Sequence, residues 1–165
     1  MHIFGLMLIL GLALQGTATQ KVETTFDKKA DFASFRTYSW GPGYNAFNPD
    51  AHKIIVAALE AEMAKLGFTK VATGANVTLA YYTLASTNVD LKALDKAERA
   101  GSDAVPTKTL GRLVVIMRNP ASGSAESQQV WSASTREYVD ADLSKLDATV
   151  RTVAARLFAT YPRPR

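Results

Sequence analysis

Two neighbouring stretches of sequence decide the fold: "RLVVIMR" at residues 112–118 and "QQVWSASTREYV" at residues 128–139. The first is a continuous run rich in branched apolar residues, which is typical of a strand with both faces buried. The second is rich in β-forming residues, and the turn-forming sequence "NPASGS" at residues 119–124 lies between the two. We therefore predict that the two stretches pair side by side as a hairpin.

Further strands are predicted before this hairpin by clusters of β-forming residues at 22–26, 36–40, 68–71 and 76–85. In the stretch 36–40, the alternation of side chains puts Tyr38 and Trp40 on one face. The stretch 76–85 is apolar on both faces, which indicates a strand inside the sheet. The stretch 68–71 is short, and we predict that it forms an edge strand.

Two helices are predicted from capping residues and apolar periodicity. Asn48 is a good N-cap, Pro49 fits the first helical position, and Gly67 supplies a stop at the carboxyl end. Asp142 caps a second helix, which ends at Pro162. Apolar residues recur in both helices at intervals of three and four, so each helix has one buried stripe. The predicted fold is an α+β two-layer sandwich, in which a mainly antiparallel sheet of about five to six strands carries both helices on one face.

The composition predicts one globular domain and excludes several chemistries. The chain has 165 residues, of which 47% are hydrophobic, and this is enough apolar material for a single domain at residues 19–165. The absence of cysteine excludes disulfides, thiol catalysis, thiolate zinc sites and a lipid attached through an N-terminal cysteine. The net charge of +4 is scattered rather than clustered, so we expect no nucleic-acid partner.

The first eighteen residues have the pattern of an export signal. The apolar run at residues 3–14 is too short to span a bilayer comfortably, but it has the length of a signal-peptide core. The small residues Gly16 and Ala18 precede an expected cleavage point, after which the mature chain begins at Thr19. We expect an exported protein that is periplasmic or associated with the outer membrane. The alternative is that residues 1–18 are retained as a membrane anchor.

A polar segment with mixed charges, residues 86–109, interrupts the predicted strands. We expect it to be a mobile insertion, because nothing in it demands a fixed structure. Within it, the sequence "LKALDKAERA" has the pattern of a short helix with a modest apolar edge formed by Leu91, Leu94 and Ala97.

Several parts of this pattern together resemble one known family. The stretches "TTFDKKADFASFRTYSW" at residues 24–40, "GRLVVIMRN" at 111–119 and "VWSASTREYV" at 130–139 are similar to the DUF4136 domain of bacterial envelope proteins. The residues that fit the family's pattern most specifically are Asp31, Phe32, Phe35, Thr37, Tyr38, Trp40 and Trp131. We expect these residues to be structural, because a strand at 36–40 delivers Tyr38 and Trp40 together to a core.

The resemblance implies an envelope location and does not imply a reaction. Members of the family are often lipoproteins attached to an outer membrane, and their molecular function is generally unassigned. The lipid-bearing cysteine is missing here, so lipid anchoring does not carry over. The segment 86–109 also lacks the glycine- and tyrosine-rich character that is common in relatives. The family supplies no catalytic residues.

An exported hydrolase acting on envelope polymer is the enzymatic alternative. His52 has to be its base, but this residue falls on the apolar stripe of the first helix, which favours structural packing. Carboxylates for glycoside cleavage are available at Glu23, Asp27, Asp31 and Glu137, although no spacing rule selects a pair among them. One histidine with scattered carboxylates gives no metal-ligand spacing either. We therefore predict no catalytic residue, no metal and no cofactor.

A non-catalytic binding or scaffolding role is the function that we predict. If both helices cover one face of the sheet, the other face is open to a partner. The candidate partner-binding residues for that face are Tyr81 or Tyr82, Thr135, Arg136 and Tyr138. Aromatic and hydroxyl side chains suit an envelope protein, a lipid or a glycan as partner. The alternative is that the rings pack inside the core. The sequence leaves the oligomeric state open.

Overall fold

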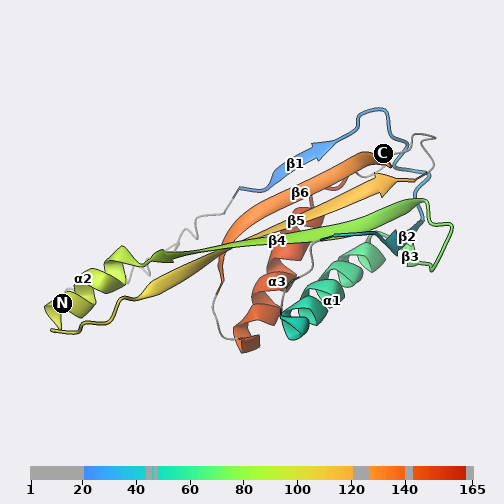
Figure 1. The fold of residues 1–165 in the computed structure, drawn as a ribbon. Coiled ribbons are helices and arrows are strands. Elements are labelled where there is room, and N and C mark those ends of the chain that lie inside the picture. The colour runs from blue at the N-terminus through green and yellow to red at the C-terminus, as the bar shows by residue number, and fades with distance from the viewer. Residues whose placement is uncertain (1–20, 44–45, 47, 121–126, 140–142, 163–165) are drawn as a thin grey trace, which may run out of the picture.

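The computed structural model describes residues 21–43, 46, 48–120, 127–139 and 143–162. These residues form one sheet and three helices (Figure 1). In chain order, the elements are β1 (Glu23–Phe26), β2 (Thr37–Trp40), α1 (Pro49–Lys65), β3 (Thr69–Lys70), β4 (Val77–Val89), α2 (Leu91–Arg99), β5 (Thr107–Asn119), β6 (Gln128–Val139) and α3 (Leu143–Phe158).

The sheet has six strands in the order β1-β6-β5-β4-β2-β3. Along the four strands β1, β6, β5 and β4, each strand is antiparallel to the next, as predicted for most of the sheet. In contrast, β2 is parallel to both β4 and β3, which the sequence did not predict. α1 lies between β2 and β3 in the chain, and a helical crossover returns the next strand in the same direction. The structure is therefore an α+β fold with a mixed sheet.

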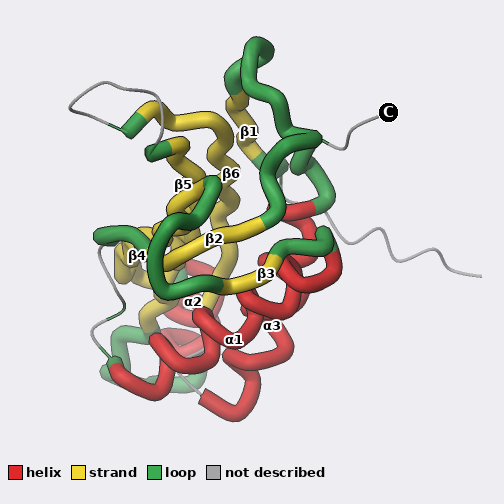
Figure 2. Tube along the Cα trace, turned by 90° about the vertical axis from the view of Figure 1, so that its right-hand side faces the viewer, coloured by secondary structure: helices red, strands yellow, loops and turns green. Residues whose placement is uncertain are grey.

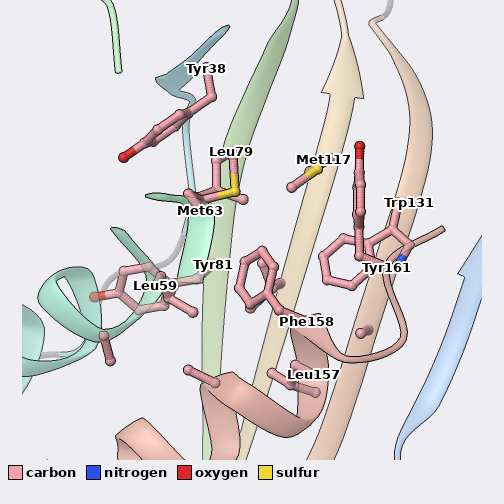
Figure 3. Close-up of a cluster of buried hydrophobic side chains, with 14 of the residues drawn as sticks. Tyr38, Leu59, Met63, Leu79, Tyr81, Met117, Trp131, Leu157, Phe158 and Tyr161 are labelled. Atoms are coloured by element: carbon pink, nitrogen blue, oxygen red, sulfur yellow. The ribbon is translucent and has the colours of Figure 1, made fainter. Parts of the chain in front are cut away.

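The helices α1 and α3 lie side by side on one face of the sheet (Figures 1 and 2). Side chains from both layers fill the space between them (Figure 3). Trp131 of β6 is fully buried, and its ring packs on Phe158 of α3 with the centroids 5.3 Å apart and on Tyr161 with the centroids 5.7 Å apart. Burial of each large apolar side chain in such a core stabilises the fold by about 1.5–3 kcal/mol.

The ends of α1 follow the sequence prediction. Asn48 Oδ1 accepts hydrogen bonds from the backbone N–H groups of Asp50 at 2.9 Å and Ala51 at 3.2 Å, and Pro49 is the first helical residue. Gly67 follows the helix with a φ of 83°, in the left-handed region that favours glycine. Asp142, predicted as the cap of the last helix, lies outside the described residues, as does the predicted export signal.

β4 and β5 are both longer than predicted, and they continue as a hairpin through the predicted insertion. The register runs outward to Val89, which pairs with Thr107. Asp90 organises the tip, because its side chain accepts a hydrogen bond from the backbone N–H of Ala93 at 3.3 Å and pairs with Lys108 Nζ at 2.6 Å. Backbone pairing proceeds through these polar residues since a hydrogen-bonded ladder does not require apolar side chains.

The three helices differ in how much they bury. α1 and α3 each bury a stripe of apolar residues, whereas α2 has no buried residue. α2 lies at the far end of the hairpin, away from α1 and α3 (Figure 1). Within the part of the chain that the structure describes, no helix is both long enough and apolar enough to cross a bilayer.

Candidate binding site

The first residues that carry the family resemblance form a turn and close one end of the core. Asp31 Oδ1 accepts a hydrogen bond from the backbone N–H of Ala33 at 3.1 Å. The ring of Phe32 meets the rings of Phe35 and Tyr161 edge to face, with centroids 5.8 Å and 5.4 Å apart. Aromatic rings favour this geometry, so the turn is anchored to the end of α3.

Thr37 joins the start of β2 to the residue that precedes β4. Asn76 Oδ1 accepts hydrogen bonds from both the backbone N–H and the hydroxyl of Thr37, each at 3.0 Å. The backbone N–H of Asn76 donates in return to Thr37 Oγ1 at 3.0 Å. These bonds hold two parallel strands in register, which is a structural role.

Tyr38 and Trp40 lie on the helix-covered face of β2. Tyr38 is 3% exposed, and Trp40 is half-buried with its Nε1 donating to Glu60 Oε1 of α1 at 2.9 Å. Lys70 Nζ contacts the same carboxylate oxygen at 2.6 Å. Burial alone raises the pKa of Glu60, but the hydrogen bonds from Lys70 and Trp40 outweigh it and lower the pKa. The strand is therefore tied to α1 through a charged hydrogen-bond network.

The strand register corrects part of the predicted partner-binding face. Tyr81 pairs with Val115, which pairs with Ala133, and this row is covered by the helices. Tyr81 is 1% exposed, and Thr135, two residues beyond Ala133 on the same face, is 3% exposed. The predicted placement of Tyr81 and Thr135 on the open face is therefore wrong. Tyr138 belongs to β6, but its side chain lies outside the described part of the structure.

Tyr82 and Arg136 are the candidates that lie on the helix-free face. Arg136 is exposed, and Tyr82 Oη accepts a hydrogen bond from Arg118 Nη2 at 3.3 Å. Nearby, Arg112 Nη2 pairs with Glu23 Oε2 at 2.9 Å. This face therefore carries side chains that are engaged with one another across strands.

His52 is held by a hydrogen bond to the buried Tyr81. Its Nδ1 lies 2.5 Å from Tyr81 Oη, and the two rings stack with centroids 5.8 Å apart. The same hydroxyl accepts a hydrogen bond from the backbone N–H of Ala46 at 3.1 Å, so it joins the segment before α1 to the first turn of the helix. Burial raises the pKa of Tyr81, which keeps the phenol protonated in this role.

The carboxylates considered for catalysis take part in separate structural contacts. Glu23 pairs with an arginine of β5 at 2.9 Å, and Asp27 accepts a hydrogen bond from a glutamine of β6 at 2.7 Å. Asp31 caps its own turn, and the side chain of Glu137 lies outside the described residues. Among the side chains that the structure places, no three histidine or acidic groups are arranged to hold a metal ion together.

An apolar groove opens on the helix-covered face, where β4 and β5 leave the helix layer. Its volume is about 300 Å³, and it is bounded by the beginning of α1, by α3 and by the strands β4, β5 and β6. Its lining includes Ala51, Ile55, Leu113, Leu146, Val150 and Val153. The sheet carries no large side chain at one side of the groove, because Ala85 of β4 pairs with Gly111 of β5 and both line it.

Thr135 is one of the lining residues of this groove, and its hydroxyl is buried. The Oγ1 atom of Thr135 is inaccessible to solvent and has no hydrogen-bond partner in the structure. A buried polar atom without a partner costs about 1–3 kcal/mol. The groove was not predicted from the sequence, since periodicity does not give the spacing between two helices. The small residues Ala85 and Gly111 were the available signal.

Residues 84–110, which we call the arm, extend past the helix layer (Figure 1). The described residues leave five large apolar side chains exposed, and four of them lie on the arm: Leu84, Val89, Leu91 and Val105. Leu91 is 74% exposed, although the predicted helix edge included it together with Leu94 and Ala97, which are half-buried. The arm therefore presents apolar surface that the described part of the chain leaves uncovered.

The fold is similar to that of solved bacterial proteins. A PDZ domain protein from Parabacteroides distasonis ATCC 8503 matches with a TM-score of 0.55 and 13% identity over 88% of this chain, which covers 36% of that protein's chain. The PelC dodecamer from Paraburkholderia phytofirmans matches with a TM-score of 0.51 and 13% identity over 84% of this chain and 95% of that chain. At these identities the likeness establishes the fold alone. No curated protein matches the sequence.

The sequence also matches a family profile across nearly all of the described structure. The profile is that of DUF4136, a domain of unknown function, and the matched residues are 22–163. This range contains the turn at Asp31, the strand with Tyr38 and Trp40, and the buried Trp131. The chain therefore belongs to the DUF4136 family.

Proposed function

We propose that this protein is an exported, non-catalytic domain that binds or scaffolds another component of the bacterial cell envelope through its arm. The observation that carries the proposal is the concentration of exposed apolar side chains on the arm, away from the core. Clustered apolar surface of this kind marks interaction sites in soluble domains. Each large apolar side chain that a partner covers fully contributes up to about 1.5–3 kcal/mol.

The envelope location is supported by the sequence. Residues 1–18 have the pattern of an export signal, and the resemblance to the DUF4136 domain of envelope proteins implies the same location. The structural neighbour PelC is a dodecamer, so a domain of this fold serves as the unit of an assembly there. We include a second copy of this chain among the protein partners that the arm is expected to contact. Lipid and glycan partners are the other outcomes of the experiment below.

The non-catalytic part of the proposal is supported by the contacts of His52 and the acidic residues. His52 Nδ1 is occupied by Tyr81, and Glu23, Asp27 and Asp31 each take part in a local structural contact. A hydrolase acting on envelope polymer is the alternative. If His52→Gln abolishes an envelope phenotype of the gene while the protein still folds, the non-catalytic proposal is wrong.

The direct experiment compares arm variants in two measurements. The first is capture of an envelope component from envelope extract, and the second is light scattering, which reports assembly of the protein with itself. In Leu91→Asp the new charge lies at the first residue of α2, where the helix dipole favours a negative group, and Val105→Asp changes an exposed residue outside the helices and strands. Ala57→Asp, at an exposed position of α1, is the matched control. These positions allow all three variants to fold.

We expect wild-type protein and Ala57→Asp to form an assembly or to retain the same envelope component. The double variant with aspartate at positions 91 and 105 should lose at least about 90% of the assembly or of the captured component. The reason is that removing two charges from water at an apolar contact is costly. Mass spectrometry of the captured material identifies the partner as protein, lipid or glycan. A wild-type monomer that captures none of these, or a double variant that behaves as wild type, contradicts the proposal.

A further inference from the structure

We propose that the outer edge of β4 pairs with the same edge of a second copy of this chain, as two antiparallel strands related by a two-fold axis. The inference rests on the function proposed above for the arm, and it names both the partner and the contact surface. Three features of β4 lead to it: the free backbone groups along its outer edge, the residue types of that stretch, and its fit to a second copy of itself.

Along the arm, the outer edge of β4 has no neighbouring strand among the described residues. β2 pairs with β4 only as far as Leu79, whereas β4 continues to Val89 (Figure 1). The carbonyl of Leu79 accepts a hydrogen bond from the backbone N–H of Gly41 at 2.8 Å, so Leu79 directs its backbone groups outward, away from β5. This direction alternates along a strand, and Thr83, Ala85 and Val89 therefore direct their backbone groups to the same side.

These outward backbone groups are open to solvent. No hydrogen bond joins the outward N–H or C=O groups of Thr83, Ala85 or Val89 to another residue in the part of the chain that the structure describes. Every residue from 84 to 89 is exposed, including the apolar Leu84 at 61% and Val89 at 44%. A row of free backbone donors and acceptors on an exposed edge is a template for another strand.

This edge also lacks the features by which native sheets prevent such pairing. Residues 83–89, with the sequence "TLASTNV", contain no charged residue, no proline and no glycine. The two end strands of the sheet differ, because β1 has four residues and begins with Glu23, and β3 has two residues, one of them Lys70. Short strands and charged side chains discourage edge pairing, whereas a long uncharged edge permits it.

A second copy of this chain fits the edge because the edge is complementary to itself. Antiparallel pairing centred on Ser86 places Thr83 of one copy opposite Val89 of the other, and this register uses the whole stretch from 83 to 89. No like charges meet, and two β-branched residues face each other, which is a favourable cross-strand pair. The two-fold axis makes the contact close at two copies, with the helix-covered parts at opposite ends of the paired strands.

The first test relies on the absence of cysteine from the sequence. In this register, Ser86 faces its own copy as a non-hydrogen-bonded pair with the Cα atoms about 4.5 Å apart, which suits a disulfide. With oxidised glutathione, Ser86→Cys should therefore form a linked dimer at least about ten times faster than Asn88→Cys. Asn88 is the matched control because it is also exposed and lies on the same side of β4, but its two copies are about 13 Å apart in this register.

The second test removes one donor from the edge without changing the pairing of β4 with β5. The N–H of Ala85 faces outward, so Ala85→Pro removes it at a position where an edge strand tolerates proline. The substitution acts twice in a symmetric dimer, and it should raise the dissociation constant measured by sedimentation at least about tenfold. Ala85→Ser retains the N–H and should leave the dissociation constant within about twofold of the wild-type value.

The inference is overturned if the wild-type protein is a monomer at every concentration, if Ala85→Pro dimerises as tightly as Ala85→Ser, or if Ser86→Cys cross-links no faster than Asn88→Cys. The aspartate variants at Leu91 and Val105 separate this result from the function proposed above, since both positions lie outside the paired stretch. Capture of an envelope component that the double variant loses, without cross-linking through position 86, contradicts this inference alone. An edge-paired dimer that persists in the double variant, with capture unchanged, contradicts the proposed function alone.

Discussion

The arm (residues 84–110) and the rest of the described domain, which we call the body, are stabilised in different ways. In the body, the sheet lies beneath α1 and α3, and Trp131 is buried against Phe158 and Tyr161. In the arm, β4 and β5 continue to pair with each other, but α2 buries no residue. Backbone pairing thus sets the length of a strand, whereas stability requires a second layer.

The largest effect is expected from removing the central ring of the body. Trp131→Ala leaves a cavity beneath α3 and should lower the free energy of unfolding by about 3–5 kcal/mol. Leu91→Ala, which truncates an exposed side chain on the arm, should change it by less than about 0.5 kcal/mol. Denaturant unfolding measures both values. Similar losses for the two variants would show that the arm contributes to the same cooperative core.

A smaller effect is expected from ionising a ring in the body at high pH. Burial, with a smaller contribution from nearby Glu60, raises the pKa of Tyr38 from 10.0 to about 12. The neutral phenol is thereby favoured in the folded state, so its contribution to stability is complete below pH 10 and is lost as the pH rises toward 12. Unfolding at pH 8 and pH 11.5 should show wild type losing about 1–2 kcal/mol more than Tyr38→Phe. Equal losses in both proteins would place this phenol in contact with solvent.

Much of the body was predictable because its elements have strong local signals. The cap at Asn48, the stop at Gly67 and the bounds of β6 (Gln128–Val139) follow from residue types that act within a few positions. The spacing of two along β2 placed Tyr38 and Trp40 on one face. In each case the deciding interaction is local in sequence.

The features that were predicted wrongly or not at all depend on contacts between distant elements. Which face of β4 the helices cover decides whether Tyr81 or Tyr82 is open, and both residues satisfy the same local pattern. The outer half of β4 is polar, so its composition resembled an insertion although its backbone pairs with β5 as far as Val89. The groove depends on the separation of α1 and α3, for which no single stretch of sequence carries a signal.

At the boundary between body and arm, the groove offers a variant that should gain stability. Thr135→Val removes a buried hydroxyl that has no hydrogen-bond partner in the structure, so the free energy of unfolding should rise by about 1 kcal/mol. Thr25→Val is the control, because Thr25 Oγ1 is exposed and hydrogen-bonded to Ser132 Oγ at 2.8 Å. Loss of the Thr25 hydroxyl should leave the free energy of unfolding unchanged or lower it slightly. A destabilised Thr135→Val, measured by thermal unfolding, would mean that the hydroxyl is satisfied in solution.

The smallest change in body stability is expected from the largest deletion. Ser86 pairs with Leu110, so replacing residues 87–109 with Asn-Gly closes β4 and β5 with a two-residue turn in the existing register. Because the deleted segment includes α2, which buries no residue, the free energy of unfolding should change by less than about 0.5 kcal/mol. In the intact protein, hydrogen exchange should be faster at arm amides than at amides of the same strands beneath α1 and α3, since local opening exposes the arm without disturbing the core. A body that loses several kcal/mol on this deletion would instead make the arm part of the folding unit, and its exposed apolar side chains would then require an explanation other than a partner.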